Sequence, residues 1–391
     1  MDADHSEVVV VGGGPAGLLA ALLAARAGAA TTLIAPPPPQ DARTTALLEG
    51  SVAVLREAGV WDSLRGAAAP LRTLRIVDGG RRLFRAPEAT FRASELGLEA
   101  FGWNVPNTAL TAALAEAFMR APGAARRFAQ ARESRPGEKL IALTLDDGST
   151  IEARVAIAAD GRNSLLRDAA GISFKSHRAP QTALAFAVEH DREHEGVSTE
   201  FHFEEGPFTL VPMPGRRSSI VWVATPGQAE ELSALSPEAL GKAATRKSGR
   251  ILGEIRVTGS IGRFPITVGA ATCFAARRTL LVGEAGHVLP PIGAQGLNLG
   301  VRDAARAAAV IAAALAERRD PGGAQALGAY SRARAADVLT RAAATDLLNL
   351  SLLSPLPPVH FARGVGLAAI SRIGPLRRFV MREGLLGAPG L

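Results

Sequence analysis

Residues 283–303 read GEAGHVLPPIGAQGLNLGVRD, and this stretch predicts how the chain folds. The apolar run at residues 279–282 is short enough for a buried strand, and an Ala-rich helical pattern begins near Leu297. Glycines and prolines are dense between Gly283 and Gly296, so the backbone there is shaped to approach a flat or anionic group. The unpaired amides of the helix N-terminus favour negative charge at that point. The alternative is an ordinary strand-to-helix crossover.

A second glycine-rich stretch, VVVVGGGPAG, stands near the start of the chain at residues 8–17. An apolar strand before it, a helix after it and another strand at 31–35 predict the βαβ unit of a dinucleotide-binding fold. Gly12, Gly14 and Gly17 fit the GxGxxG pattern of that unit. They serve the tight turn, the approach of a pyrophosphate and the packing of the helix on the sheet.

One element of the dinucleotide pattern is missing. The acidic residue expected at the end of the second strand is absent, because that strand runs into prolines 36–39. Asp41 is a candidate substitute. It opens the segment DARTTALL at residues 41–48, in which Arg43 is either a cofactor contact or a solvated arginine at a helix start.

A third motif, ADGRNSLLR, occupies residues 159–167. A hairpin turn at 146–148 precedes a strand at 151–159, and this strand delivers Asp160 and Gly161. A short carboxylate at a strand end, followed by a glycine that admits a ligand, suits a contact to cofactor hydroxyls. An ordinary Asp-Gly turn is the alternative.

Composition restricts the class of protein. The chain has 391 residues, 47% hydrophobic and 21% charged, which is typical of an ordered soluble protein long enough for two domains. The formal charge of +7 comes almost entirely from arginine, and no basic stripe is interleaved with aromatics, so we do not expect nucleic-acid binding. The single cysteine, Cys273, suits a reducing cytosol, and the acidic start MDADHSE does not resemble a secretion signal. The expected location is cytoplasmic.

Residues 176–272 have a different pattern, with short alternating runs separated by turn residues, which predicts a mostly antiparallel sheet. The fold class is therefore α/β, with a Rossmann-type nucleotide domain, an inserted sheet domain and C-terminal helices. We assign residues 1–70, 106–175 and 273–345 to the first domain, and 71–105 and 176–272 to the second. The run HDREHE at 190–195 has histidine spacing that could suit a metal, but a solvated charged turn is the default, and no metal site is expected.

The C-terminal tail, assigned to residues 346–391, is apolar and basic. From Leu347 to Leu391, leucines and phenylalanines are mixed with arginines against a single acid. Docking at a membrane surface or on a partner is one interpretation, and a helix packed on its own domain is the other. The basic and acidic residues of the tail are Arg363, Arg372, Arg377, Arg378, Arg382 and Glu383.

Together and in this order, the three motifs resemble the signatures of the flavin-dependent aromatic hydroxylases, the family of para-hydroxybenzoate hydroxylase. The segments DARTTALL, GWNVPN (residues 102–107) and PPIGAQG (290–296) resemble the branch that hydroxylates ubiquinone precursors. The resemblance covers nearly the whole chain. It implies bound FAD, O2 as co-substrate, a flavin hydroperoxide, NAD(P)H as electron donor and a lipophilic aromatic substrate, here a polyprenylated phenol. It also suggests a ubiquinone-biosynthesis protein complex and peripheral contact with the inner membrane.

The resemblance also assigns residues. Pro290, Pro291 and Gly293 are expected at the reactive face of the flavin. Glu284 is expected at the ribityl chain, and it departs from the family, which usually has Asp or Asn there, by a longer side chain. Arg167 matches the third motif. The expected cofactor-binding residues are Gly12, Gly14, Pro15, Ala16, Gly17, Arg43, Asn107, Asp160, Gly161, Gly283, Glu284, Gly296, Leu297 and Asn298.

Three alternatives remain open: a hydroxylase of another aromatic metabolite, a flavin reductase acting on a prenyl lipid, and a non-enzymatic lipid binder. The ring position that is hydroxylated cannot be read from the sequence. Tyr330 is the only tyrosine, and it lies far in sequence from the predicted substrate sheet. We therefore expect no tyrosine base, and an apolar pocket that orients the ring by shape.

Overall fold

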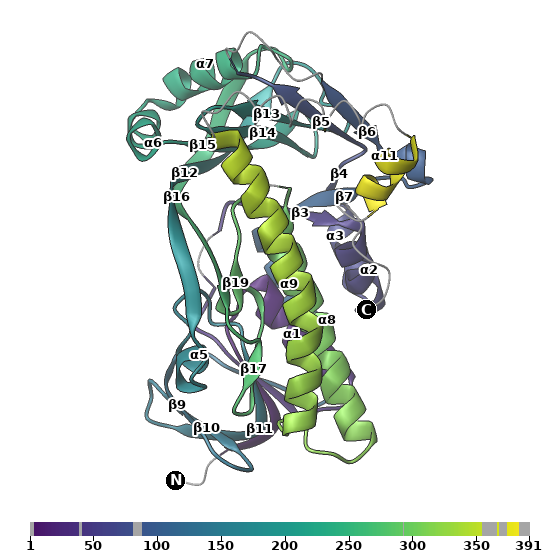
Figure 1. The fold of residues 1–391 in the computed structure, drawn as a ribbon, viewed down its shortest axis with the longest axis vertical. Helices are drawn as coiled ribbons and strands as arrows, with labels where there is room; N and C mark the ends of the chain where they lie inside the picture. The colour runs from purple at the N-terminus through teal and green to yellow at the C-terminus, as the bar shows by residue number, and fades with distance from the viewer. Residues whose placement is uncertain are drawn as a thin grey trace.

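The computed structural model describes residues 4–38, 41–80, 88–291, 293–353, 366 and 374–382. Two large sheets lie at opposite ends of the long axis (Figure 1). The long strands β12 (Phe174–His190) and β16 (Ile255–Ala271) run between them, and the helices α8 (Gln295–Ala316) and α9 (Ala324–Leu353) lie along the same axis.

The first sheet has the strand order β17-β18-β11-β1-β2-β8. β1 pairs in parallel with β11 on one side and β2 on the other, so the order reverses at β1. In doubly wound sheets, ligands bind at such a switch point, beyond the carboxyl ends of the strands. β9 (Ala131–Pro136) and β10 (Ile141–Leu145) extend the sheet with antiparallel pairing. The remaining strands are β1 (Asp4–Val11), β2 (Thr31–Ile34), β8 (Ala124–Arg127), β11 (Thr150–Ala158), β17 (Ala275–Ala276) and β18 (Thr279–Leu281).

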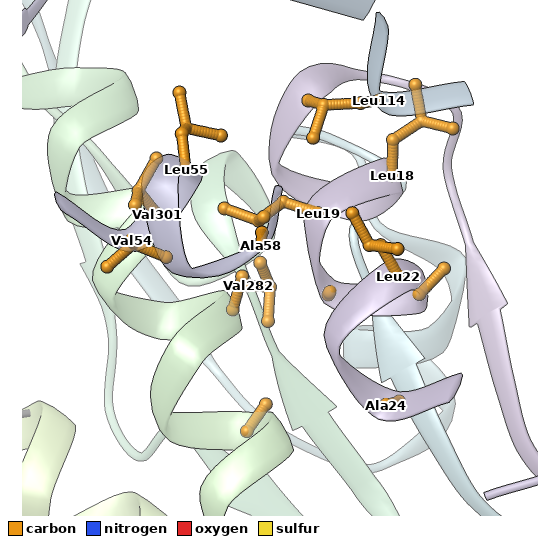
Figure 2. Close-up of a cluster of buried hydrophobic side chains, with 14 of the residues drawn as sticks. Leu18, Leu19, Leu22, Ala24, Val54, Leu55, Ala58, Leu114, Val282 and Val301 are labelled. Carbon is orange, nitrogen blue, oxygen red and sulfur yellow. The ribbon is translucent and has the colours of Figure 1, made fainter. Parts of the chain in front are cut away.

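The core of this domain is built around α1 (Pro15–Arg26), which is buried along nearly its whole length. Figure 2 shows Leu18, Leu19 and Leu22 of α1 in one cluster with Leu55 of α2 (Glu49–Glu57) and Val301 of α8. This burial accounts for the apolar composition of the helix. Among the described residues, no helix has the length and hydropathy needed to span a membrane. The other helices near this domain are α3 (Trp61–Arg65), α4 (Asn107–Met119) and α5 (Leu165–Ala169).

The second sheet has the order β19-β16-β12-β15-β14-β13-β5-β6 and is antiparallel except where β13 meets β5. One face packs against α6 (Pro226–Ser233) and α7 (Pro237–Lys247), with Leu184, Phe208 and Leu240 in that core. Because side chains alternate along a strand, the opposite face is left for a ligand. Its other strands are β5 (Thr73–Asp78), β6 (Ala89–Arg92), β13 (Val197–Phe203), β14 (Gly206–Met213), β15 (Arg217–Ala224) and β19 (His287–Val288).

A small sheet of β3 (Thr44–Leu48), β7 (Gly102–Pro106) and β4 (Ala69–Pro70) lies between the two large ones. Two short 3₁₀ turns, Ala93–Leu96 and Gly283–Ala285, complete the described elements of the two domains. The mixed α/β class that the sequence predicts is confirmed.

Four local expectations need correction. Helix α8 begins at Gln295, two residues before the expected Leu297, and Arg43 precedes a strand rather than a helix. The sequence pattern also missed α6 and α7, because their short helical runs lie inside a region dominated by alternation. His190 is buried at the end of β12 instead of lying in a solvated turn.

The described part of the tail packs on the chain's own second sheet. Helix α11 (Gly374–Met381) places Arg377 in an ion pair with Glu95 and over the ring of Phe91. Met381 is fully buried. The own-domain interpretation therefore holds for this helix, although Arg378 and Arg382 remain exposed. The other charged residues of the tail, Arg363, Arg372 and Glu383, lie outside the described residues.

Candidate flavin and substrate site

The three sequence motifs meet at one edge of the first sheet. Gly12, Asp160 and Gly283 follow β1, β11 and β18, which are adjacent parallel strands. The backbone is so close there that a Cβ on Gly12 would lie 2.0 Å from the carbonyl oxygen of Ala159. A Cβ on Gly17 would similarly lie 2.1 Å from the carbonyl oxygen of Gly12. Two of the three glycines of the first motif are thus required by packing.

A cavity of about 1470 Å³ opens at this edge and extends to the free face of the second sheet. This volume exceeds the roughly 300–1,000 Å³ of a typical small-molecule site, so there is room for a cofactor and a substrate together. Gly12, Asp160 and Asn298 do not line the cavity. The expected residues that do line it are Gly14, Pro15, Ala16, Gly17, Arg43, Asn107, Gly161, Gly283, Glu284, Pro290, Pro291, Gly293, Gly296 and Leu297.

Two helix N-termini border the cavity without a side-chain cap. α1 starts after Gly14, where a Cβ would meet nothing within 4 Å, and this leaves space for a ligand. α8 starts after Ala294, which has the left-handed φ of 56° that non-glycine residues rarely adopt. In both helices the first-turn amides have no intrahelical partner. Gly296 in the first turn of α8 likewise leaves open space beside it. These two positions fit a pyrophosphate and the electron-rich end of a flavin ring.

Asp160 fits the polar half of the same cofactor. Its Oδ2 accepts a hydrogen bond from the amide of Leu166 at 3.3 Å, but its Oδ1 is buried with no partner. Burial raises the pKa of Asp160 above its ordinary value. An unpaired buried acceptor of this kind suits a ligand hydroxyl, because an unsatisfied polar group costs free energy. The orphan oxygen and the open glycines together fit the FAD that the motifs imply.

A polar network lies along the next part of the cavity wall. Arg43 donates two hydrogen bonds to Asp41, at 2.7 and 2.8 Å, and lies over the ring of Phe264. Asn107 donates to Asp41 at 2.9 Å and accepts from Thr45. The Arg43 guanidinium lowers the pKa of Asp41 to about 2, and the Asn107 amide contributes. Asp41 is thus held as an anion by its neighbours, and Arg43 is fixed at the cavity wall.

Glu284 forms an ion pair with Arg162, with Nε to Oε2 at 3.0 Å. Both residues line the cavity. The extra methylene of Glu284 relative to the family's Asp or Asn is therefore used to reach an arginine of the third motif. Arg167 of the same motif donates to the carbonyl oxygens of Arg162 and Ala285. Arg167 thus holds the two loops together instead of facing the ligand.

The side chain of Asn298 is fully engaged with protein. Its Oδ1 accepts from the Leu48 amide and the Ser51 hydroxyl, and its Nδ2 donates to the carbonyl oxygens of Ala46 and Ala294. These bonds tie β3 to the start of α8. We therefore propose that Asn298 shapes the cofactor site through the loop it holds and not through a side-chain contact.

A buried ionic cluster centred on Asp303 holds the loop that begins at Gly283. Asp303 accepts hydrogen bonds from the Gly283 amide at 2.8 Å, from His287 at 2.6 Å and from Arg334 at 2.6 Å. Burial alone would raise the pKa of Asp303, but His287 and Arg334 outweigh it and hold that pKa below its ordinary value. Tyr330 is fully buried nearby and donates to the carbonyl oxygen of Leu281 at 2.6 Å. Tyr330 does not line the cavity.

The sequence analysis missed the residues on the sheet side of the cavity. The lining face is mostly apolar, but Glu200 and His202 of β13 and Thr209 of β14 face it. Asn104 of β7 is also there, with its Nδ2 donating to the Pro212 carbonyl and its buried Oδ1 unpaired. The alternation of Glu200 and His202 in the strand TEFHF is the signal that could have shown them, since residues two apart share a face.

The run at residues 190–195 is anchored by hydrogen bonds within the run and to β14 and β15. His190 bonds to the Arg192 carbonyl and the Ser218 hydroxyl, and His194 bonds to the Met213 carbonyl. Within the described ranges, no group of three or more His, Cys, Asp or Glu side chains is arranged to hold a metal ion.

Comparisons with known proteins agree with this geometry. A family model described as an FAD binding domain matches residues 5–342, and the chain belongs to this family. Ubiquinone hydroxylase UbiL of Rhodospirillum rubrum is 36% identical over 347 residues, covering 88% of this chain and 80% of that protein. The 3-demethoxyubiquinol 3-hydroxylase of Escherichia coli is 29% identical over 355 residues, covering 88% of this chain and 87% of its own.

The fold also matches a solved structure, p-nitrophenol 4-monooxygenase PnpA from Pseudomonas putida DLL-E4, with a TM-score of 0.81. That match covers 99% of this chain and 100% of the other. Because the two sequences are only 20% identical, the match is evidence for a shared fold alone. The protein is therefore an oxidoreductase, an FAD-dependent monooxygenase of aromatic rings. Within that class it groups with the ubiquinone-biosynthesis hydroxylases, as its motifs indicate.

Proposed function

We propose that the protein hydroxylates the ring of a polyprenylated phenol that is a precursor of ubiquinone, with FAD, O2 and electrons from NAD(P)H. The observation that carries this proposal is the single cavity that joins the flavin motifs to a mostly apolar sheet face. Leu74, Ile76, Phe91, Val211 and Val221 give that face the character a prenyl chain requires. The named activities of the two curated relatives support the same substrate class.

Different residues of the chain have different roles toward the cofactor and the cavity wall. FAD, when bound, supplies the oxygen-transfer chemistry. The α1 N-terminus would hold its phosphates, the unpaired Asp160 oxygen would accept from one of its hydroxyls, and the uncapped amides at the start of α8 would stabilise negative charge on its ring. The prolines 290 and 291 border the cavity and fix its wall without polar side chains, which helps to exclude water from the reaction.

The proposed domain division follows the two large sheets, except that β19 of the second sheet falls within residues 273–345. The first domain, 1–70, 106–175 and 273–345, would hold the cofactor, and the second, 71–105 and 176–272, would hold the substrate. Helix α11 lies at the β5–β6 edge of the second sheet, and Met381 lines the cavity. We place the exposed Arg378, Phe379 and Arg382 of this helix at a membrane surface, from which a prenylated substrate would enter. Association with other proteins of the pathway would use the same surface.

The test is restoration of ubiquinone in bacterial strains that each lack one ring hydroxylase. Growth and ubiquinone in one strain would support the proposal, and the intermediate that the strain accumulates would identify the ring position. In parallel, the purified protein is given NADH or NADPH, O2 and either 2-geranylphenol or a water-soluble phenol. Turnover of the water-soluble phenol alone would support another aromatic substrate. Reduction of a prenyl lipid with no stoichiometric O2 consumption would support the reductase alternative.

A further inference from the structure

The cavity contains a buried acid–base pair that none of the cofactor motifs explains. His202 Nε2 and Glu200 Oε1 are 2.7 Å apart on adjacent same-face positions of β13, and both residues line the cavity. The side chain of His202 is 5% exposed and that of Glu200 is 20% exposed. Burying such groups beside an apolar surface costs free energy unless they are paired, and pairing does not repay the full cost. A functional role would account for their position.

The cross-strand neighbours place the pair within the substrate half of the cavity. Glu200 is the register partner of Thr209 on β14, and Thr209 is that of Val221 on β15. In the next row, Ser219 of β15 accepts a hydrogen bond from Thr44, the residue after Arg43. The pair therefore shares its face of the sheet with residues that contact the flavin side of the cavity. An aromatic ring bound between the Glu200–His202 pair and the flavin side would be within reach of both.

The geometry points to His202 as the base that takes the proton from a ring hydroxyl of the aromatic substrate, with Glu200 as its positioning residue. This assignment rests on the proposed function, because it requires a phenolic substrate. Glu200 holds the proton on Nε2 of His202, which leaves Nδ1 with a lone pair. Among the described residues, no donor or acceptor is bonded to that Nδ1. The arrangement matches the usual requirement that a base be oriented by a third group.

The proton transfer balances without any further reagent. The phenolic O–H bond breaks, an N–H bond forms at Nδ1 of His202, and the electron pair of the O–H bond stays on the oxygen. The negative charge enriches the ring carbons that the oxygen-transfer step attacks. Glu200 stabilises the resulting imidazolium by charge. The hydroxylated ring carbon then releases its hydrogen as a proton to water, and the C–H electron pair restores the aromatic ring and the phenolate. The phenolate oxygen takes its proton back from His202.

Other charged groups around the pair must be considered in any pH experiment. Asp78 of β5 is the register partner of His202, and Arg75 of the same strand donates to the Thr199 hydroxyl. Arg217 of β15 faces the same cavity. On the flavin side, the charged groups occur in two ion pairs, Arg43 with Asp41 and Arg162 with Glu284.

The first measurement is product formed from 2-geranylphenol by FAD-loaded His202→Asn, His202→Gln and Glu200→Gln variants across pH. His202→Asn should lose about 10²-fold in kcat at neutral pH, the size expected for a general base. It should recover as the pH rises toward about 10, where a phenol ionises by itself. Glu200→Gln should lose less and show a displaced pH profile with KM little changed. Matched controls on the same sheet are His177→Asn and Glu189→Gln, both exposed on β12.

The second measurement does not depend on turnover. Bound 4-nitrophenol reports its own ionisation by the phenolate absorbance, and the oxidised wild-type holoenzyme should shift its midpoint below that of the free phenol. His202→Asn should abolish the shift with the flavin spectrum and melting temperature preserved. Equal shifts in wild type and both His202 variants would overturn the assignment. So would unchanged kcat and pH profile in well-folded variants. The wild type could leave 2-geranylphenol unreacted and still lower the ionisation midpoint of bound 4-nitrophenol in a way that depends on His202. That outcome would contradict the proposed substrate and support His202 as the base.

Discussion

Replacing Asp160 with asparagine should weaken FAD binding without lowering the stability of the cofactor-free protein. In the structure, one carboxylate oxygen accepts from Leu166 and the other is buried and unpaired. Asparagine can keep the first bond and removes the charge whose burial is unfavourable. The lost contact is a charge-assisted hydrogen bond to a ligand hydroxyl, which is worth about 1.5–3 kcal/mol. The dissociation constant for FAD should therefore rise about 10- to 150-fold.

The pH dependence gives an independent check with a definite sign. Burial raises the pKa of Asp160 in the folded state above its ordinary value. A carboxyl with a raised folded pKa stabilises the folded state below its unfolded pKa of about 4 and loses that contribution as pH rises through the folded value. The melting temperature of the cofactor-free wild type should thus fall, relative to that of Asp160→Asn, as pH rises from about 4 toward neutrality.

The assay is a fluorescence titration of the cofactor-free protein with FAD, beside melting curves with and without excess FAD. Asp62→Asn, at an exposed position on α3, serves as the control. Two results would refute the reasoning. One is an FAD affinity equal to wild type, and the other is an equal loss of melting temperature in the presence and absence of FAD, which would assign Asp160 a structural role.

Four further expectations follow from the same contacts. Arg43→Ala should lower the flavin-to-protein ratio and return the pKa of Asp41 from about 2 toward its ordinary value, as a carboxyl NMR titration would show; an unchanged ratio contradicts the contact. FAD should be non-covalent, because the ring of His287 is held by Asp303, so acid precipitation should leave all colour in the supernatant, and a yellow pellet contradicts it. Removing residues 364–391, or raising salt, should reduce sedimentation with anionic liposomes; indifference to both excludes the membrane role. Tyr330→Phe should keep turnover within a few-fold but lower the melting temperature, since its hydroxyl donates to a buried carbonyl oxygen; intact FAD binding with lost hydroxylation would make this tyrosine catalytic.

The flavin half of the fold could be predicted from sequence because its function depends on backbone. Gly12 and Gly17 are required by close approach to the carbonyl oxygens of Ala159 and Gly12, and such requirements leave glycines at fixed spacing. The strands before these motifs end in short, apolar, buried runs, such as residues 8–11 of β1, so their carboxyl ends were also readable. Helix α8 differed from its expected start by two residues, because Ala294 adopts a left-handed conformation that composition does not signal.

The roles that the sequence could not specify are those that depend on tertiary neighbours. Arg167 and Asn298 stand in motif positions, yet both side chains bond to protein. Nothing in the sequence distinguishes a motif residue that contacts a ligand from one that holds the loop in place. The ion pair of Glu284 with Arg162 joins residues 122 positions apart, and a local pattern carries no information about such a pair.

The substrate half was harder to read for a different physical reason. A sheet that packs on helices with one face and lines a cavity with the other has the same alternation as a sheet facing water. The polar members of β13, Glu200 and His202, therefore look like solvent-facing residues until the fold shows that their face is enclosed. Asn104 is the same case, since its unpaired Oδ1 is informative only because the residue is buried. In a hydroxylase of this architecture, glycines at fixed spacing therefore identify the cofactor site in the sequence. The side chains that determine substrate preference are recognised only once the fold shows that they line an enclosed cavity.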